Sequence, residues 1–206
     1  VPDRKVLEVP TQYSTIQSAV DAAQDGDMVY VYPGDYGVYQ GSMTLKEGIR
    51  LQGAGPLLTV FNNGSMEINM ARNSMLDGFG GYMKVNCADG HAIVSNNWIR
   101  TGISANRQAD TIIRNNIVTE NSLIMQGTVK VVIENNTFAN NIGGLKTAIY
   151  LDSATPETKI YLKSNIISNN SIVVSDKNTA DTSHQHILPS FNTYWNNTKN
   201  SYSSIF

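Results

Sequence analysis

One pattern recurs four times between residues 93 and 170: Ile93-Val-Ser-Asn-Asn-Trp-Ile99, Ile112-Ile-Arg-Asn-Asn-Ile-Val118, Val132-Ile-Glu-Asn-Asn-Thr-Phe138 and Tyr161-Leu-Lys-Ser-Asn-Ile-Ile167. The second polar residue of each central pair falls at Asn97, Asn116, Asn136 and Asn165, so the steps are 19, 20 and 29 residues. A period of this size with one longer step is typical of stacked coils with a loop inserted in one coil. Each copy reads as strand, tight corner and strand.

A coil of about 20 residues cannot bury its own apolar side chains, so it must stack on its neighbours. Asparagine suits the corner because it tolerates left-handed backbone and because its amide can bond to the amide in the next coil. We therefore expect a ladder of the four corner asparagines. Two residues beyond each corner, we expect one column of apolar side chains: Ile99, Val118, Phe138 and Ile167.

Length and composition favour a single elongated domain over residues 1–206. The net charge of −2 gives no reason to expect nucleic acid as a partner, and no apolar run is long enough to span a membrane. Cys87 is the one cysteine, so a disulfide framework is excluded, and it does not decide the compartment. The chain starts at Val1 as a mature protein or a trimmed domain would, and it ends at Phe206 without a recognisable cap. We therefore expect the last coil to be closed in one of three ways: by Ile205 and Phe206, by a further segment that has been lost, or by another subunit.

The N-terminal part predicts one helix before the coils. Ser14-Thr-Ile-Gln17 has the form of a capping box, and apolar residues then follow at helical spacing up to Asp25-Gly26-Asp27. We expect a helix over about residues 14–25, covering the open end of the first coil, and coils over about residues 28–198. The polar stretches 142–158 and 175–186 are expected to be loops.

The segment from Ser14 to Tyr36, followed by Ile49-Arg-Leu-Gln-Gly-Ala-Gly55, resembles the opening of pectate-lyase-like right-handed parallel β-helix proteins. The Asn-Asn repeats and Phe191-Asn-Thr-Tyr-Trp-Asn-Asn-Thr198 resemble later coils of that superfamily, so the resemblance covers nearly the whole chain. It implies an all-β fold, a right-handed parallel β-helix with a short N-terminal capping helix. It also implies a secreted or cell-envelope protein that deals with polysaccharide. The architecture hosts lyases, hydrolases, epimerases and non-catalytic proteins, so it does not fix the activity.

Two groups of outward residues are candidates for carbohydrate contact. Ser95, Arg114, Glu134 and Lys163 each stand two residues before a corner asparagine, so the last three form an Arg–Glu–Lys column that could hold an acidic sugar. The alternative is a surface ion-pair ladder. Tyr30 and Tyr32 share one face of a strand, and Arg50 and Gln52 follow one coil later. Aromatic faces beside polar donors suit a sugar, and Tyr36 and Tyr39 could extend that patch, but such tyrosines can also simply cover the side of the coil.

No catalytic set known from the resembling enzymes is complete. A glycoside hydrolase needs two carboxyl groups across the bond, and here Asp89-Gly-His91 remains without an Asp-Asp pair. A lyase needs clustered acidic calcium ligands and a base. Asp77, Asp89 and Asp110 are scattered, and Lys84, Arg100 and Arg107 are candidate bases or clamps for which solvated side chains are the preferred interpretation. His184 and His186 with Asp181 could bind a metal, although two surface histidines explain the pattern as well.

We therefore expect no resident cofactor or metal, with calcium as the exception if the protein is a lyase. The first hypothesis is a β-helix that binds polysaccharide without an intact catalytic set. The second is a lyase or hydrolase of an acidic polysaccharide, and the third is a structural module that self-associates through its C-terminal coil.

Overall fold

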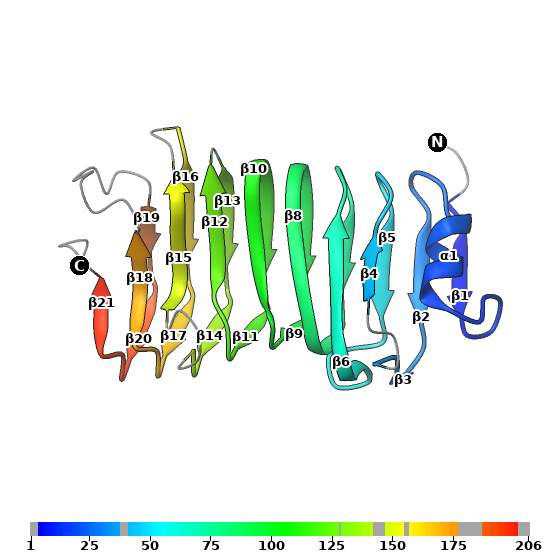
Figure 1. The fold of residues 1–206 in the computed structure, drawn as a ribbon, viewed down its shortest axis with the longest axis horizontal. Coiled ribbons are helices and arrows are strands. Elements are labelled where there is room, and N and C mark those ends of the chain that lie inside the picture. The colour runs from blue at the N-terminus through cyan, green and yellow to red at the C-terminus, as the bar shows by residue number, and fades with distance from the viewer. Residues whose placement is uncertain are drawn as a thin grey trace.

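The computed structural model describes residues 4–37, 41–127, 129–141, 147–154, 157–176 and 187–201. The chain is a solenoid in which parallel strands of successive coils lie side by side along one axis (Figure 1). The first coil lies at one end of the stack, and β21 (Lys199–Ser201) lies at the other. The all-β class and the parallel solenoid are thus confirmed, while the right-handed sense stays a prediction.

Three parallel sheets form the sides of the solenoid. Sheet A consists of β3 (Gly34–Asp35), the start of β6 (Thr59–Met70), the start of β8 (Gly80–Ser95), β9 (Trp98–Ile99), β11 (Ile117–Thr119), β14 (Thr137–Ala139), β17 (Ile166–Ser168) and β20 (Thr193–Trp195). Sheet B consists of β4 (Gly41–Thr44), the end of β6, the middle of β8, the start of β10 (Gly102–Arg114), β12 (Leu123–Gly127), β15 (Thr147–Ala154), β18 (Ile172–Asp176) and β21.

Sheet C is the third side and has nine described strands. They are, in spatial order, β1 (Val6–Val9), β2 (Met28–Val31), β5 (Arg50–Gly53), β7 (Met75–Asp77), the end of β8, the end of β10, β13 (Lys130–Glu134), β16 (Lys159–Lys163) and β19 (Ile187–Ser190). Strands β6, β8 and β10 pass from one sheet to another without a break. The register within sheet C is continuous, so its outward side chains form straight columns.

The core fills the inside of the solenoid because side chains alternate along each strand. In β13, Val131 and Ile133 point inward and are fully buried, whereas Val132 between them is partly exposed. The predicted column of apolar residues beyond the corner pairs strand to strand, and all four members are fully buried: Ile99, Val118, Phe138 and Ile167. Cys87 lies in this core as a free thiol, and burial raises its pKa to about 12.

The predicted asparagine ladder is present at the corner between sheets C and A. The Oδ1 atom of Asn136 accepts from the backbone N of Asn116 at 2.9 Å and from its Nδ2 at 3.1 Å. Its own Nδ2 donates to the carbonyl of Ile113 at 2.9 Å and to Oδ1 of Asn165 at 3.1 Å. Asn97 begins the ladder: its backbone N and its Nδ2 donate to Oδ1 of Asn116 at 3.0 and 3.1 Å, while its own Oδ1 accepts from the backbone N of Phe79 at 2.9 Å. Asn192 extends the ladder past the predicted members, because its Oδ1 accepts from the backbone N and Nδ2 of Asn165 at 2.9 Å.

The two tasks that we assigned to one corner residue are divided between two neighbours. The left-handed backbone belongs to the residue before each ladder asparagine, with φ of 57° at Asn96, 55° at Asn115, 56° at Asn135 and 53° at Ser164. The ladder residue itself turns inward and is buried. A buried amide needs bonding partners, whereas the left-handed position faces solvent, so one side chain cannot do both.

Helix α1 (Ile16–Ala22) lies at the N-terminal end of the stack beside β1 and β2 (Figure 1). It buries Ile16, Ala19 and Val20, so the expected cap of the first coil is confirmed. The predicted capping box is wrong by one residue. Thr15 is the N-cap, and its hydroxyl accepts from the backbone N of Ser18 at 3.1 Å. Gln17 instead donates to Oδ1 of Asp21 at 2.7 Å, one helical turn on.

Part of the expected loop at residues 142–158 is a strand. Residues 147–154 form β15, which pairs with β12 and continues sheet B. Its alternating Thr147, Ile149 and Leu151 are buried, which is strand periodicity that we did not use. Residues 175 and 176 likewise end β18. Tyr39, Asp181, His184, His186, Ile205 and Phe206 lie outside the described residues, so the metal hypothesis and closure of the last coil remain predictions.

Candidate functional site

Eight of the nine described strands of sheet C place an apolar side chain in one outward line, and β5 places Arg50 there. Register pairs place them directly above one another along the axis: Val6, Met28, Arg50, Met75, Ile93, Ile112, Val132, Tyr161 and Leu188. We call this set the apolar stripe. Arg50 is its one charged member. Each of the nine is partly or well exposed, up to 50% for Val6, 45% for Leu188 and 38% for Tyr161.

A polar column borders the apolar stripe on the side of the asparagine ladder. Its members follow the same register: Glu8, Tyr30, Gln52, Asp77, Ser95, Arg114, Glu134, Lys163 and Ser190. We call this set the near column. Tyr30 and Gln52 of one predicted patch therefore lie in the same column as Arg114, Glu134 and Lys163 of the other, whereas Arg50 lies in the apolar stripe. The structure confirms the alignment of Arg114, Glu134 and Lys163, and it adds Tyr30 to the same line.

A second polar column borders the stripe on its other side, and its described members are His91, Asp110, Lys130 and Lys159. We call this set the far column. The Nδ1 atom of His91 lies 3.9 Å from Oδ2 of Asp110, and both side chains are roughly half exposed. Lys130 is exposed. The face thus presents an apolar stripe between two rows of hydrogen-bonding and charged groups.

Arg114, Glu134 and Lys163 of the near column are aligned, but their side chains form no ion pairs with one another. Among the described residues, the ion pairs are Lys84–Glu67, His91–Asp110 and Arg100–Glu120, so none connects Arg114, Glu134 and Lys163. The backbone carbonyls of these three accept from the ladder amides at 2.9 to 3.1 Å, whereas their side chains point away from the ladder. The expected alternative, a surface ion-pair ladder, is not formed by these three side chains.

The N-terminal end of the face is aromatic. The rings of Tyr30 and Tyr32 meet edge to face with centroids 5.0 Å apart, and the hydroxyl of Tyr32 donates to Oε1 of Glu8 at 3.2 Å. This bond and the nearby negative charge raise the pKa of Tyr32. Tyr32 is 36% exposed. The pair thus gives a fixed aromatic corner at the first coils, as a sugar platform requires.

Arg50 belongs to a hydrogen-bond network that connects three neighbouring strands of the face, β5, β7 and the end of β8. A guanidinium nitrogen of Arg50 donates to Oε1 of Gln52, and Nε2 of Gln52 donates to Oδ1 of Asp77 at 2.8 Å. Oδ2 of Asp77 accepts from the Ser95 hydroxyl at 2.6 Å and from Nδ2 of Asn96 at 2.8 Å. Asp77 is 6% exposed, so this carboxylate fixes neighbouring coils and has little free surface for a ligand.

The basic residues that we considered as catalytic candidates lie on other surfaces. Lys84 is on the outside of sheet B, with Nζ 4.0 Å from Oε1 of Glu67. Arg100 stacks over Tyr82 with its Cζ 4.1 Å from the ring centroid, and it also pairs with Glu120. Arg107 sits at a bulge in β10 with φ of 59°. Across the described ranges, no three His, Cys, Asp or Glu residues come together as metal ligands.

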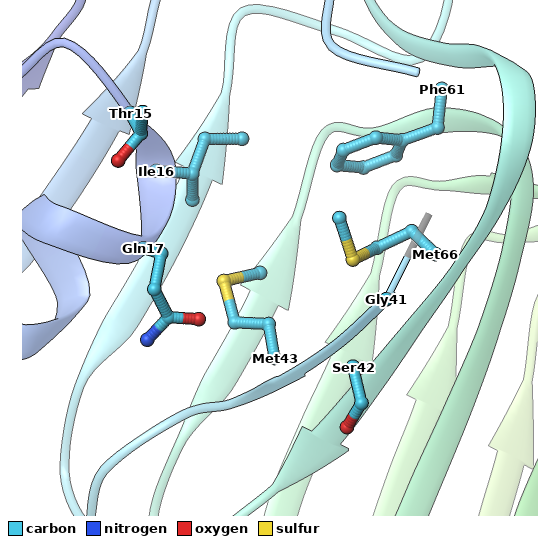
Figure 2. Close-up of a pocket in the computed structure, with 8 residues that line it drawn as sticks. All are labelled: Thr15, Ile16, Gln17, Gly41, Ser42, Met43, Phe61 and Met66. Atoms are coloured by element: carbon cyan, nitrogen blue, oxygen red, sulfur yellow. The ribbon is translucent and has the colours of Figure 1, made fainter. Parts of the chain in front are cut away.

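A separate pocket of about 280 Å³ lies beside the first turn of α1, far along the stack from β13 and β16 (Figures 1 and 2). Ile16, Met43, Phe61 and Met66 point toward a common space, and Thr15, Gln17, Gly41 and Ser42 complete the lining (Figure 2). None of these eight side chains is ionisable. The described lining therefore offers no ionisable group, and we do not assign chemistry to it.

Sequence reasoning missed the apolar stripe and a second ladder. Three members of the stripe, Ile93, Ile112 and Val132, are the first residues of repeat copies, but we had assigned them to neither side of the coil. The second ladder joins Asn141, Asn170 and Asn197 at the corner between sheets A and B, with Nδ2 to Oδ1 distances of 2.6 and 3.1 Å. Its signal was the repeated Asn-Asn pair at residues 140, 169 and 196.

A scan against protein-family models finds no match, and searches of the curated proteins and of the solved structures find none either. Membership of the pectate-lyase-like superfamily therefore stays a resemblance. Within the described ranges, no helix has the length and apolar character that a membrane span requires.

Proposed function

We propose that this protein binds a polysaccharide along the outer face of sheet C, without an intact catalytic set. The observation that carries the proposal is the apolar stripe over nine strands in register, bordered by the near column along its length and by the far column beside β8, β10, β13 and β16. A sugar ring has apolar C–H patches and a rim of hydroxyl groups, so it suits an apolar surface with hydrogen-bonding groups on both sides.

The dimensions of the face favour a polymer as the ligand. Neighbouring strands lie about 4.8 Å apart, so nine strands in register span roughly 38 Å along the axis. A ligand that follows the stripe would meet Tyr30 at one end and Tyr161 near the other. A long chain suits a surface that offers many weak contacts. Once one sugar unit is bound, the next units belong to the same molecule, so each adds affinity without the entropy cost of immobilising a separate ligand.

The charges of the later coils favour acidic sugars there. Arg114, Lys130, Lys159 and Lys163 face outward beside Asp110 and Glu134, which leaves an excess of positive charge. Arginine presents a planar fork to a carboxylate, and the lysines add point charges. We further propose a secreted or cell-envelope location, which is what the resemblance to the pectate-lyase-like superfamily implies.

The test is retention of the full chain by a panel of neutral and acidic polysaccharides in affinity electrophoresis, with and without calcium. We expect retention by at least one polysaccharide, loss of retention in Tyr30→Ala, and weaker retention at high salt for an acidic ligand. Lys84→Ala on the outer face of sheet B is the matched control and should bind as the unchanged chain does.

Two further readouts separate the alternatives. Ultraviolet absorbance reports unsaturated lyase products, and reducing ends report hydrolysis. Turnover of any polysaccharide would overturn the non-catalytic part of the proposal. Retention that Tyr30→Ala and Arg114→Ala leave unchanged would overturn the assignment to sheet C, and absence of retention across the panel would overturn the proposal as a whole.

A further inference from the structure

Two neighbouring strands of sheet C carry opposite charges at the two ends of their outward residues. Strand β10 presents Asp110, Ile112 and Arg114, and β13 presents Lys130, Val132 and Glu134. The order is thus negative, apolar, positive on β10, and positive, apolar, negative on β13. A strand with this pattern is complementary to a second copy of itself that runs in the opposite direction.

We propose that a second copy of this chain docks face to face on the outer face of sheet C. A two-fold axis parallel to the solenoid axis keeps each coil opposite the same coil of the other copy and reverses the strand direction. The apolar stripe then packs on its counterpart. Asp110 faces Arg114 of the second copy, Lys130 faces Glu134 of the second copy, and each pair occurs twice because such an interface is isologous.

The size of the face suits an association of this kind. Nine strands at about 4.8 Å and five residues at about 3.3 Å give a face of roughly 38 by 16 Å, or about 600 Å² on each copy. The total of about 1,200 Å² is at the lower end of specific interfaces. An exposed apolar stripe of this length on a single copy is itself typical of an interaction surface.

The same surface would serve both occupants, so pairing would regulate the proposed function by excluding the polysaccharide. That regulatory part rests on the proposed function, whereas the pairing itself does not. The pairing is therefore measured on the full chain without polysaccharide, by sedimentation velocity over a wide concentration range. A chain that does not pair can still be retained by a polysaccharide, and a chain that no polysaccharide retains can still pair.

The neighbouring charges allow a variant that separates pairing from stability. Asp110→Lys combined with Lys130→Asp keeps opposite charges side by side on β10 and β13, and within one copy it removes the half-exposed His91–Asp110 pair. It places like charges across the interface, because the new lysine faces Arg114 and the new aspartate faces Glu134. Adding Arg114→Glu and Glu134→Arg reverses the near column as well, so the chain with all four substitutions regains complementarity between copies.

We expect a dimer of the unchanged chain, a dissociation constant raised at least roughly tenfold by the double substitution, and recovery to within about threefold with all four. Thermal melting checks that the variants are folded, and Lys84→Asp on sheet B is the control that should leave the dimer unchanged. Lys163→Glu should strengthen pairing, because it gives β16 opposite charges at its two ends. A chain that stays monomeric at every concentration, or a dimer that the double substitution does not weaken, would overturn the proposal.

Discussion

Glu134 and Asn136 are two residues apart in the same repeat, yet the surfaces they belong to differ in kind. Asn136 stands in the ladder, is 1% exposed and has every amide atom bonded to another coil or its own corner. Glu134 stands in the near column, is partly exposed and shares no ion pair with its stacked neighbours. Both columns have the same spacing and register.

The difference shows that register alone does not make an interaction. A buried amide without a hydrogen-bond partner lowers stability, so each ladder asparagine must bond to the next one. An exposed charge is already solvated, so an ion pair with a stacked neighbour adds little stability. The ladder therefore serves the fold, and the outer face of sheet C remains available to an external partner. The following substitutions test that contrast.

Asn136→Leu should have the largest effect on the free energy of unfolding. Asn116 and Asn165 would each lose bonds to this side chain. We expect a loss of roughly 3–5 kcal/mol, because at least two buried polar groups lose partners at about 1–3 kcal/mol each. Urea unfolding followed by circular dichroism measures it. A loss under about 1 kcal/mol would mean that the ladder is dispensable.

Asn135→Val should have a smaller effect, because it tests the left-handed corner without touching the ladder. Asn135 has φ of 56° and is exposed. A β-branched side chain in that conformation should cost about 1–2 kcal/mol. Asn135→Gly is the matched control and should stay within about 0.5 kcal/mol of the unchanged chain. Equal losses in both variants would contradict the division of tasks at the corner.

Asp27 should make stability depend on acid pH. Its Oδ atoms accept from the backbone N of Gln24 at 2.9 Å and of Lys5 at 3.0 Å, and these bonds lower its pKa. A lowered pKa in the folded state gives stability that is present above the pKa of the unfolded chain and is lost as pH falls through the folded value. Asp27→Asn should flatten that loss in urea midpoints below pH 5. An unchanged pH profile would contradict the assignment.

Glu134→Ala and Lys163→Ala should change the free energy of unfolding least, each by about 0.5 kcal/mol or less, since both side chains are solvated and unpaired with one another. The same urea titration measures it, with Asn136→Leu as the positive control. A loss above about 1.5 kcal/mol in either variant would show that the near column supports the fold.

The repeat predicted most of the fold because a coil period constrains every stacked position at once. The ladder from Asn97 to Asn165 and the column from Ile99 to Ile167 followed directly. The N-cap was misplaced because Ser14 and Thr15 are adjacent residues that can both cap a helix, and the spacing of Ser14 from Gln17 matched the capping-box pattern.

The candidate site was harder to predict than the fold. The spacing placed Arg114, Glu134 and Lys163 in one column, but the link from Tyr30 through Gln52 and Asp77 to Ser95 needs the register of the irregular coils between residues 56 and 91. That register depends on an irregularity in β6 between Phe61 and Met66, where extra residues shift the pairing with β8. The identity of an aliphatic residue in a strand also does not tell whether its side chain faces the core or the solvent.

The central claim is that the outer face of sheet C, and not another side of the solenoid, binds the ligand. The most direct measurement compares Ile112→Asp with Ile117→Asp for retention by whichever polysaccharide retains the unchanged chain. The two isoleucines are five residues apart and both face outward, Ile112 on sheet C and Ile117 on sheet A. We predict that Ile112→Asp loses retention and that Ile117→Asp keeps it. Equal retention by both variants, or loss confined to Ile117→Asp, would contradict the claim.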